Sequence, residues 1–466
     1  MLVHLNLIPV LKHIGEMQDD GLRSFVISVL LSQYYSSFRV PRLYGSCPPL
    51  PSLLTHFSPH PLTTFPLFYP KLRGFITTTF LSKLMPYHLP LFHQILHTLN
   101  PFTPTPKILS LQNHVMSEGI VLDDGSYVSL VWPPCSPPFM VGDTLVLILP
   151  GMNNSSETGF VRCLQQTLTL KLNNNKSNNG HVHCCILDYR LTGTSQHLQK
   201  PNENPHPSCA DGWLDLPTVI SHINHHYTSP PIHLVGQSLG GGMTLKYLGG
   251  IDTPQNIVSG TCVSPPVDYS KVAKHLEDGI VSRVCNFVMT VPCKIALVLN
   301  GTMRRAIYNK SKLFSALTCL TVRGFEDAVL VPLLDYTSPE DYYNKNSPKS
   351  TILNIRVPTL IITAEDDPIV PPPDEIKNEN IGVAVVDFGG HLGFFDFMGW
   401  SWSDEVVAEH VGRRIGEWEK REGGEEVRRK RTSSIQSNES DVSEASSTGL
   451  VKVKRRPSVR GTILGF

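Results

Sequence analysis

The chain has 466 residues, of which 41% are hydrophobic, so it can bury at least one sizeable core. Lysine plus arginine equals aspartate plus glutamate at 40 each, and this balance gives no electrostatic reason to expect nucleic acid or an acidic polymer as a partner. The ten cysteines, from Cys47 to Cys319, include no CxxC pair and no metal-ligand spacing, and Cys184 and Cys185 lie in an apolar run. We therefore expect reduced thiols, no metal, and an intracellular protein that is cytoplasmic or peripherally membrane-associated.

Residues 1–107 are rich in proline, leucine, phenylalanine and histidine, and no hydrophobic period lasts there. Nowhere in the chain does an apolar run approach the roughly 18 residues of a spanning helix, and the first residues turn acidic too soon for a signal peptide. The apolar stretches 25–31 and 75–96 could contact a membrane surface. Packing against the rest of the protein is the simpler interpretation of both.

The pattern changes in residues 108–132, which predict two strands joined by a turn at Asp124-Gly125. Unbroken apolar runs follow, at 145–151, 182–189, 232–238, 257–263, 359–364 and 383–390. Such runs are typical of parallel strands buried on both faces. Helices are expected between them, at 159–172, 214–226 and 241–247. The alternation predicts an α/β protein with a mostly parallel central sheet and helices on both faces.

Residues 266–356 interrupt this alternation with several amphipathic helix candidates, among them 271–289. Because the interruption falls between two strands, we expect a helical cap inserted over the carboxyl ends of the strands. From 421 to 466 the chain is polar and charged, which predicts a disordered tail. The sequence thus divides into the N-terminal segment, an α/β domain over 108–420 with its cap, and the tail.

The segment Gly236-Gln237-Ser238-Leu239-Gly240 matches the pattern G-x-S-x-G. The pattern alone is weak, but here an apolar strand runs into it and a helix begins directly after it. Glycines two residues before and after Ser238 are required because side chains there would collide in so tight a turn. The sequence therefore predicts Ser238 as a nucleophile, and the alternative is a purely structural strand–turn–helix junction.

A nucleophilic serine needs a base, and the base needs an orienting acid. Only His391, of the 19 histidines, directly follows an apolar strand in the chain order serine, acid, histidine. For the acid we expect Asp367, just past the end of the strand 359–364. The weaker alternatives are Asp366, Glu365 and Asp387.

The oxyanion formed in such a reaction needs two backbone donors. We expect the N–H of Leu239, which follows the nucleophile, and the N–H of Met152, which follows the turn Pro150-Gly151. An ordinary strand-ending turn is the alternative at Pro150-Gly151. The sequence contains no P-loop and no dinucleotide fingerprint in a strand–helix context, so no cofactor is expected.

These motifs together resemble a known family. They are LVLILPGM, LDYR, VGQSLGGGMTLKYLG, PEDYYNKNS, VPTLIITAEDDPIVP and FGGHLGFFD. Over roughly residues 108–415 the chain is similar to the abhydrolase-domain-containing hydrolases, which include the bacterial YheT-type proteins and eukaryotic acylglycerol lipases and phospholipases. The resemblance implies the α/β-hydrolase fold, the triad Ser238, Asp367 and His391, and hydrolysis of esters of acyl lipids such as monoacylglycerols, phospholipids or short and medium-chain esters.

The chain departs from the family pattern in three places. It has Arg190-Leu191 where members usually carry Arg-Gly, residues 171–180 look like an inserted loop, and the family's N-terminal segment is not recognisable. These departures leave substrate preference and membrane attachment open. Two alternative functions also remain: a catalytically silent scaffold, and an acyltransferase, because His391 and Asp396 match H-x4-D.

Overall fold

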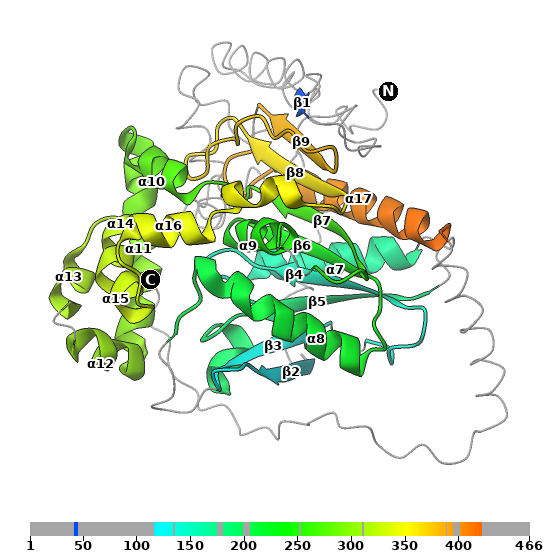
Figure 1. Cartoon of the computed structure of the whole chain (residues 1–466), viewed down its shortest axis with the longest axis horizontal. Coiled ribbons are helices and arrows are strands. Elements are labelled where there is room, and N and C mark those ends of the chain that lie inside the picture. The colour runs from blue at the N-terminus through cyan, green and yellow to red at the C-terminus, as the bar shows by residue number, and fades with distance from the viewer. Residues whose placement is uncertain are drawn as a thin grey trace, which may run out of the picture.

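A computed structural model describes residues 42–44, 116–133, 136–174, 180–198, 206–250, 253–309, 312–387, 389–394 and 401–421. The expectations for residues 25–31, 75–96 and 396 and for the charged tail after 421 lie outside these ranges, as does the N-terminal segment apart from 42–44. The arrangement of the described elements is drawn in Figure 1.

A single sheet organises the described part of the chain, where nine strands follow the order β1-β9-β8-β7-β6-β4-β5-β3-β2. The strands are β1 (Arg42–Tyr44), β2 (Met116–Val121), β3 (Tyr127–Trp132), β4 (Thr144–Leu149), β5 (Val182–Asp188), β6 (Ile232–Gln237), β7 (Ile257–Val263), β8 (Thr359–Ala364) and β9 (Ile381–Val386). The six strands from β9 to β5 are parallel, whereas β1 joins one edge and β3 the other in antiparallel pairing. The predicted α/β-hydrolase sheet is confirmed; β1, in the N-terminal segment, was not predicted.

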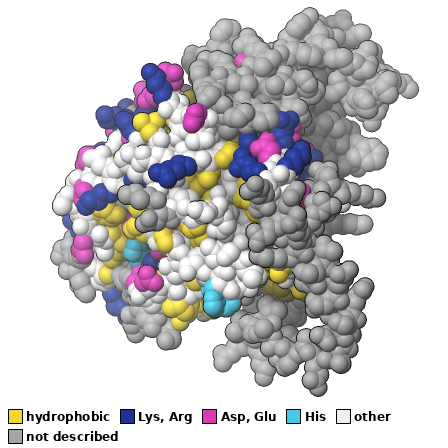
Figure 2. Space-filling model, turned by 45° about the vertical axis from the view of Figure 1, so that its right-hand side comes forward, with side chains coloured by type: hydrophobic (Ala, Val, Ile, Leu, Met, Phe, Trp, Pro, Cys, Tyr) yellow, Lys and Arg dark blue, Asp and Glu magenta, His cyan; other side chains and the backbone are white. Residues whose placement is uncertain are grey.

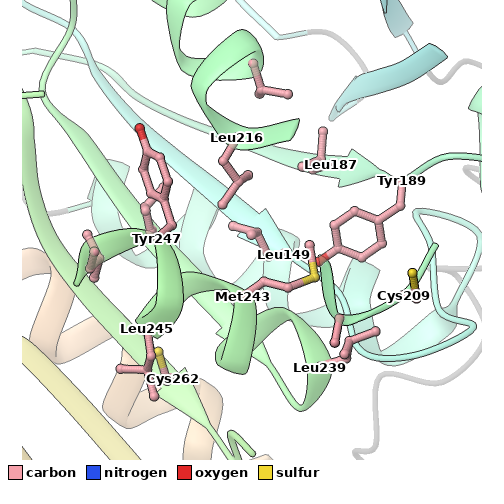
Figure 3. Packing of buried hydrophobic residues seen from close by; sticks show 14 of the residues in the cluster. Leu149, Leu187, Tyr189, Cys209, Leu216, Leu239, Met243, Leu245, Tyr247 and Cys262 are labelled. Carbon is pink, nitrogen blue, oxygen red and sulfur yellow. The ribbon is translucent and has the colours of Figure 1, made fainter. Parts of the chain in front are cut away.

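Helices cover both faces of this sheet, which is why its inner strands are apolar without alternation. On β4, Leu145, Leu147 and Leu149 face one hydrophobic cluster, and Val146 and Ile148 face another. The first cluster includes α8 (Leu216–His226) and α9 (Leu239–Leu248), and the second includes α7 (Gly159–Asn174) and α17 (Trp402–Glu419). Figure 3 shows part of the first cluster, where residues of β4, β5, α8 and α9 converge.

The β2–β3 hairpin confirms the turn expected at Asp124-Gly125. Gly125 has a φ of 81°, a conformation that glycine adopts without steric cost. The amide of Leu122 bonds the carbonyl of Ser126 at 2.8 Å, which closes the loop. On the face shown in Figure 2, basic and acidic side chains lie among small hydrophobic areas, in keeping with the chain's balanced charge.

Between β7 and β8 the chain forms a group of helices at one end of the sheet (Figure 1). They are α10 (Tyr269–Glu277), α11 (Ile280–Leu299), α12 (Gly301–Asn309), α13 (Leu313–Thr318), α14 (Val322–Phe325), α15 (Val331–Leu333) and α16 (Pro339–Asn346). Segment 271–289, expected as one helix candidate, belongs to two, because Gly279 with a φ of 85° breaks the chain direction. Likewise, Lys171 to Asn174 of the expected inserted loop are the last turn of α7.

Helix α11 also corrects the expectation that no segment could cross a membrane. Residues Ile280–Val298 are long and apolar enough to do so by length and composition, although 33% of this window is buried in the protein. Counting uninterrupted apolar runs misses it, because Ser282, Asn286 and Thr290 divide a helix whose mean hydropathy is nevertheless high.

Candidate active site

Ser238 lies at the sharp junction between β6 and α9, with φ 51° and ψ −119°. This is a conformation that non-glycine residues rarely adopt, and it is typical of strained functional turns. A Cβ atom at Gly236 would lie 2.5 Å from the carbonyl oxygen of Gly240, and one at Gly240 would lie 2.1 Å from that of Leu149. Both glycines are therefore required, for the steric reason expected from the sequence.

His391 lies on the turn after β9 and forms hydrogen bonds through both ring nitrogens. Its Nε2 is 2.7 Å from Ser238 Oγ, and its Nδ1 is 2.9 Å from Asp367 Oδ2. Ser238 is half-buried, whereas His391 and Asp367 are buried. Three residues that are far apart in the sequence thus form one chain of hydrogen bonds at the carboxyl ends of β6, β8 and β9.

The neighbouring aspartates after β8 have different contacts. Asp367 Oδ1 accepts hydrogen bonds from the amides of Ile369 and Val370 at 2.8 and 2.9 Å, which orients its other oxygen toward His391. Asp366 is fully buried and points elsewhere, because its Oδ1 accepts the amides of Gly389 and Gly390 at 2.9 and 2.8 Å. Asp366 therefore fixes the backbone before the histidine. Glu365, a weaker alternative from the sequence, is exposed, and Asp387 is half-buried.

The two expected oxyanion donors lie on either side of Ser238. Leu239 is the first residue of α9, and the first amides of a helix have no acceptor within the helix. On the other side, a Cβ atom at Gly151 would lie 3.2 Å from Ser238 Cβ, so the loop after β4 passes directly beside the serine. Met152 follows in that loop and is half-buried.

Asp188, at the end of β5, is a residue that the sequence analysis did not single out. It is fully buried and accepts four hydrogen bonds: from the amide and hydroxyl of Ser156 at 2.6 and 2.7 Å, and from the amide and hydroxyl of Thr194 at 2.7 and 3.0 Å. Tyr189 adds a hydroxyl bond to the Pro150 carbonyl at 2.9 Å. These contacts hold the loop that contains Met152. The only sequence signal was an acid at the end of an apolar strand.

Arg190, the last residue of the LDYR motif, is bound by two carboxylates. Leu191, which follows it, is the position at which the chain departs from the family pattern. Its guanidinium forms two hydrogen bonds of 2.7 Å to Asp215 and also pairs with Asp124 in the hairpin turn. Burial alone would lower the pKa of Arg190, but the two carboxylates outweigh burial and raise it. Leu191 has a φ of 58°, the left-handed region in which the family's usual glycine is favoured.

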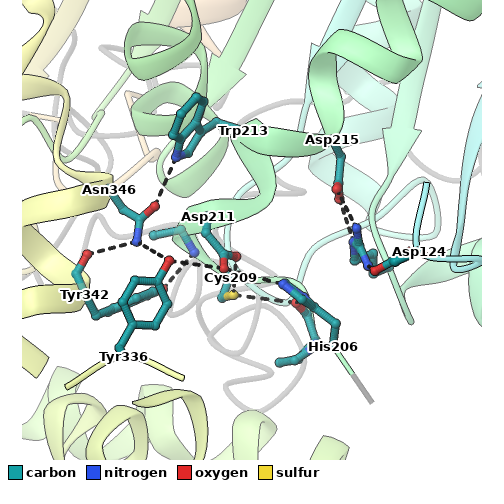
Figure 4. A network of polar contacts seen from close by, with 12 residues as sticks. Asp124, His206, Cys209, Asp211, Trp213, Asp215, Tyr336, Tyr342 and Asn346 are labelled. Atoms are coloured by element: carbon teal, nitrogen blue, oxygen red, sulfur yellow. Dashed lines mark hydrogen bonds and ion pairs between the residues drawn. The ribbon is translucent and has the colours of Figure 1, made fainter. Parts of the chain in front are cut away.

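Within the described ranges, one group of three side chains could hold a metal ion, although the sequence predicted no metal site. The ligand atoms of His206, Cys209 and Asp211 lie within 4.8 Å of one another. Cys209 Sγ also donates to Asp211 Oδ1 at 2.8 Å (Figure 4). Burial would raise the pKa of Asp211, but His206 outweighs burial and lowers it. The H-x2-C-x-D spacing is not one of the common metal patterns, which is why it was missed.

Asp211 lies on a short helix, η4 (Ala210–Asp215). This helix connects the sheet to the helices between β7 and β8, which we call the cap. The amide of Ala210 donates to Tyr342 Oη at 2.8 Å, and Trp213 Nε1 donates to Asn346 Oδ1 at 3.0 Å (Figure 4). A second connection joins the loop after β4 to α11, where Asn153 Nδ2 lies 3.3 Å from Cys293 Sγ. The cap is therefore in direct contact with the loop beside Ser238.

A serine on a strained strand-to-helix turn, at the carboxyl edge of this sheet order, defines the α/β-hydrolase class. The chain is similar to phospholipase ABHD3 of Homo sapiens, with 23% identity over 64% of this chain and 70% of that protein. It is also similar to monoacylglycerol lipase ABHD2 of Danio rerio, with 26% identity over 60% of this chain and 65% of that protein. The chain is thus similar to the abhydrolase-domain serine hydrolases, and this similarity supports a carboxylic ester hydrolase.

No family model matches the chain. Among solved structures, the esterase Pf2001 of Pyrococcus furiosus is similar, with 18% identity, a TM-score of 0.39, and coverage of 68% of this chain and 96% of that chain.

Proposed function

We propose that Ser238, His391 and Asp367 form the catalytic triad of an esterase that acts on acyl lipids. The observation that carries this proposal is the unbroken hydrogen-bond chain from Ser238 Oγ through His391 to Asp367, at 2.7 and 2.9 Å. Such a chain joins a nucleophile to a base and the base to an orienting carboxylate.

In the first half of the reaction, Ser238 Oγ bonds to the ester carbonyl carbon while its proton moves to His391 Nε2. The negative charge that develops on the carbonyl oxygen is stabilised by the amides of Leu239 and Met152. Asp367 keeps Nδ1–H hydrogen-bonded and stabilises the imidazolium. The carbon–oxygen bond to the alcohol then breaks, and the departing alcohol takes the proton from Nε2.

In the second half, water attacks the acyl-enzyme and gives its proton to His391 Nε2. Collapse of this intermediate breaks the bond between the acyl carbon and Ser238 Oγ, which takes the proton back. The products are a carboxylic acid and an alcohol, and the enzyme is regenerated.

The proposed substrate class is the ester bond of a monoacylglycerol, a phospholipid or a short to medium-chain acyl ester. It is supported by the similarity to proteins named as a phospholipase and a monoacylglycerol lipase. The apolar residues Leu239 and Met152 flank the serine, which suits an uncharged acyl chain better than a charged substrate.

A fluorophosphonate probe and a panel of esters of increasing acyl length test this proposal. We expect the wild type to be labelled and to turn over longer acyl esters, and Ser238→Ala to lose labelling and at least about 10⁴-fold in kcat. Ser221→Ala, at an exposed serine on α8, is the matched control and should behave as the wild type. Labelling that persists in Ser238→Ala would overturn the nucleophile, and cleavage of acetyl esters alone would overturn the lipid substrate.

A further inference from the structure

Helix α11 carries an exposed apolar stripe along its whole length. The stripe consists of Ile280, Val284, Phe287, Val291, Ile295 and Val298. Their spacing of three or four residues puts them on one face of the helix. Ile280 is 81% exposed and Phe287 46%, values far from those of a packed core helix. Within the described structure, this face has no partner that would account for its composition.

The exposed apolar residues continue beyond α11. Tyr308 of α12, Phe314 and Leu317 of α13, and Leu320 are also exposed, Phe314 by 79%. Ten of the seventeen exposed large hydrophobic side chains in the described ranges lie within residues 280–320. Such concentration in one short segment is typical of an interaction surface rather than of scattered surface residues.

The charge of the same segment is one-sided. Residues 279–325 contain no aspartate or glutamate and seven basic residues, although the whole chain is balanced at 40 and 40. The seven are Arg283, Lys294, Arg304, Arg305, Lys310, Lys312 and Arg323. Two of them pair with acids outside the segment, Arg323 with Glu340 and Lys312 with Asp327. In this segment an apolar helix face occurs together with basic residues and without acidic ones. Such a segment is complementary to a bilayer surface, where anionic headgroups lie above acyl chains.

We propose that the outer face of α11, together with the exposed apolar residues up to Leu320, docks onto the surface of an anionic phospholipid bilayer. This inference rests on the proposed function, because the acyl-lipid substrate lies in such a surface. Helix α11 would then be the element of the cap that brings Ser238 to the substrate.

The inner face of α11 indicates that the helix lies along the bilayer and does not cross it. Ser282, Asn286 and Thr290 are buried against the rest of the cap. Asn286 Oδ1 accepts the amide of Val322 at 2.7 Å, and Lys294 Nζ donates to the carbonyl of Cys319. A spanning helix would have to give up these polar contacts with the rest of the cap. A helix with one apolar face outward and a polar face fixed to its protein is suited to the membrane interface.

Vesicle flotation of the full-length protein tests the apolar stripe. The wild type should float with vesicles of phosphatidylcholine and phosphatidylserine, and combined Phe287→Asp and Val291→Asp should weaken binding by at least about tenfold. Both positions are exposed, so the variant should fold. Leu170→Asp combined with Leu353→Asp, at exposed leucines outside the cap face, is the matched control and should bind as the wild type.

Charge reversal tests the basic residues. Combined Arg304→Glu and Arg305→Glu should weaken binding to phosphatidylserine vesicles by about tenfold or more and change binding to pure phosphatidylcholine little. Arg356→Glu with Lys377→Glu, at exposed positions elsewhere, should leave binding unchanged.

Hydrolysis of a soluble short-chain ester, measured on the same samples, separates this inference from the proposed function. All four variants should cleave it at the wild-type rate if they affect only membrane docking. A wild type that floats but cleaves no ester would overturn the proposed function and leave the docking result intact. Unchanged flotation of the stripe variant, self-association without flotation, or resistance to alkaline carbonate extraction would each overturn the docking inference.

Discussion

The carboxyl edge of the sheet and the outer face of the cap differ in how their side chains are satisfied. At the sheet edge, Asp188, Asp366 and Asp367 are each almost fully buried, and each accepts at least two hydrogen bonds from named backbone amides or side chains. On the cap, the stripe from Ile280 to Val298 leaves its apolar atoms in solvent.

The two regions meet different requirements: the sheet edge must position reacting groups precisely, whereas the outer face of the cap must offer apolar contact area. Nucleophilic chemistry requires reacting groups held within fractions of an ångström, and His391 and the three aspartates are held by hydrogen bonds from within the protein. Apolar contact with a surface is non-directional and requires only area. The two regions should therefore respond differently to substitution, the first in kcat and stability and the second in binding.

The largest expected effect separates the two adjacent aspartates. Asp367→Asn removes the charge beside His391 Nδ1 and can favour the wrong tautomer, so kcat on a soluble ester should fall by about 10⁴-fold. Asp366→Asn leaves that contact intact and should act mainly by loosening the turn at Gly389 and Gly390, with a smaller loss of kcat and a lower melting temperature. Equal losses of kcat in the two variants would remove the distinction that their contacts make.

A second substitution tests how much the loop beside the serine depends on Asp188. Asp188→Asn retains the shape but has only one acceptor oxygen for four donors, so the free energy of unfolding should fall by about 3 kcal/mol. Because the loop carries Met152, the rate of fluorophosphonate labelling should fall as well. Chemical denaturation and labelling kinetics measure the two effects, and the cap stripe variant, with neither effect, is the comparison.

Glu326, a half-buried residue that follows α14 in the cap, should make stability depend on pH. Burial raises the pKa of Glu326 to about 7, although its contacts with Tyr343 and Arg323 act in the opposite direction. Between pH 4.5, the ordinary value, and about 7, the folded state binds more protons than the unfolded state, so this group's contribution falls as pH rises.

Glu326→Gln should remove that loss. The variant should gain up to about 3 kcal/mol over the wild type at pH 8 and little at pH 4, as measured by denaturation at both values. A gain that is equal at the two pH values would show that Glu326 does not titrate in this interval.

The smallest expected effect is at Leu191, the departure from the family pattern. Leu191→Gly relieves a left-handed backbone conformation worth about 1–2 kcal/mol, but it loses partial packing and adds freedom to the unfolded chain. The net change in melting temperature should therefore be slight and upward, with kcat unchanged. A clear loss of stability would mean that the packing of the leucine outweighs the strain.

Much of the fold could be predicted from the sequence because buried parallel strands are continuous apolar runs, and β4 to β9 all begin within two residues of the expected positions. The candidate site could be predicted because its signals are read directly along the sequence. These signals are the glycines at 236 and 240 and the chain order of serine, acid and histidine. Their roles stay predictions that the proposed experiments test.

The features that could not be predicted depend on contacts between residues far apart in the sequence, or on the direction in which a side chain points. The sequence favoured Asp367 over Asp366, but it could not indicate that Asp366 accepts the amides of Gly389 and Gly390, because the local backbone sets where each carboxylate points. Asp188 bonds Ser156, 32 positions away, which no local pattern indicates. The continuity of α11 was hidden by the polar residues on its inner face.

The contact between Asn153 and Cys293 makes the bilayer a candidate allosteric effector. It joins the helix proposed to lie on lipid to the residue next to Met152, so a shift of α11 on docking would reach the oxyanion loop. Coupling between two sites is reciprocal by thermodynamic linkage. If lipid binding stabilises the loop in the form that holds the oxyanion, then enzyme carrying the fluorophosphonate adduct, whose phosphonyl oxygen takes the oxyanion position, should bind vesicles more tightly, and Asn153→Ala should weaken this coupling.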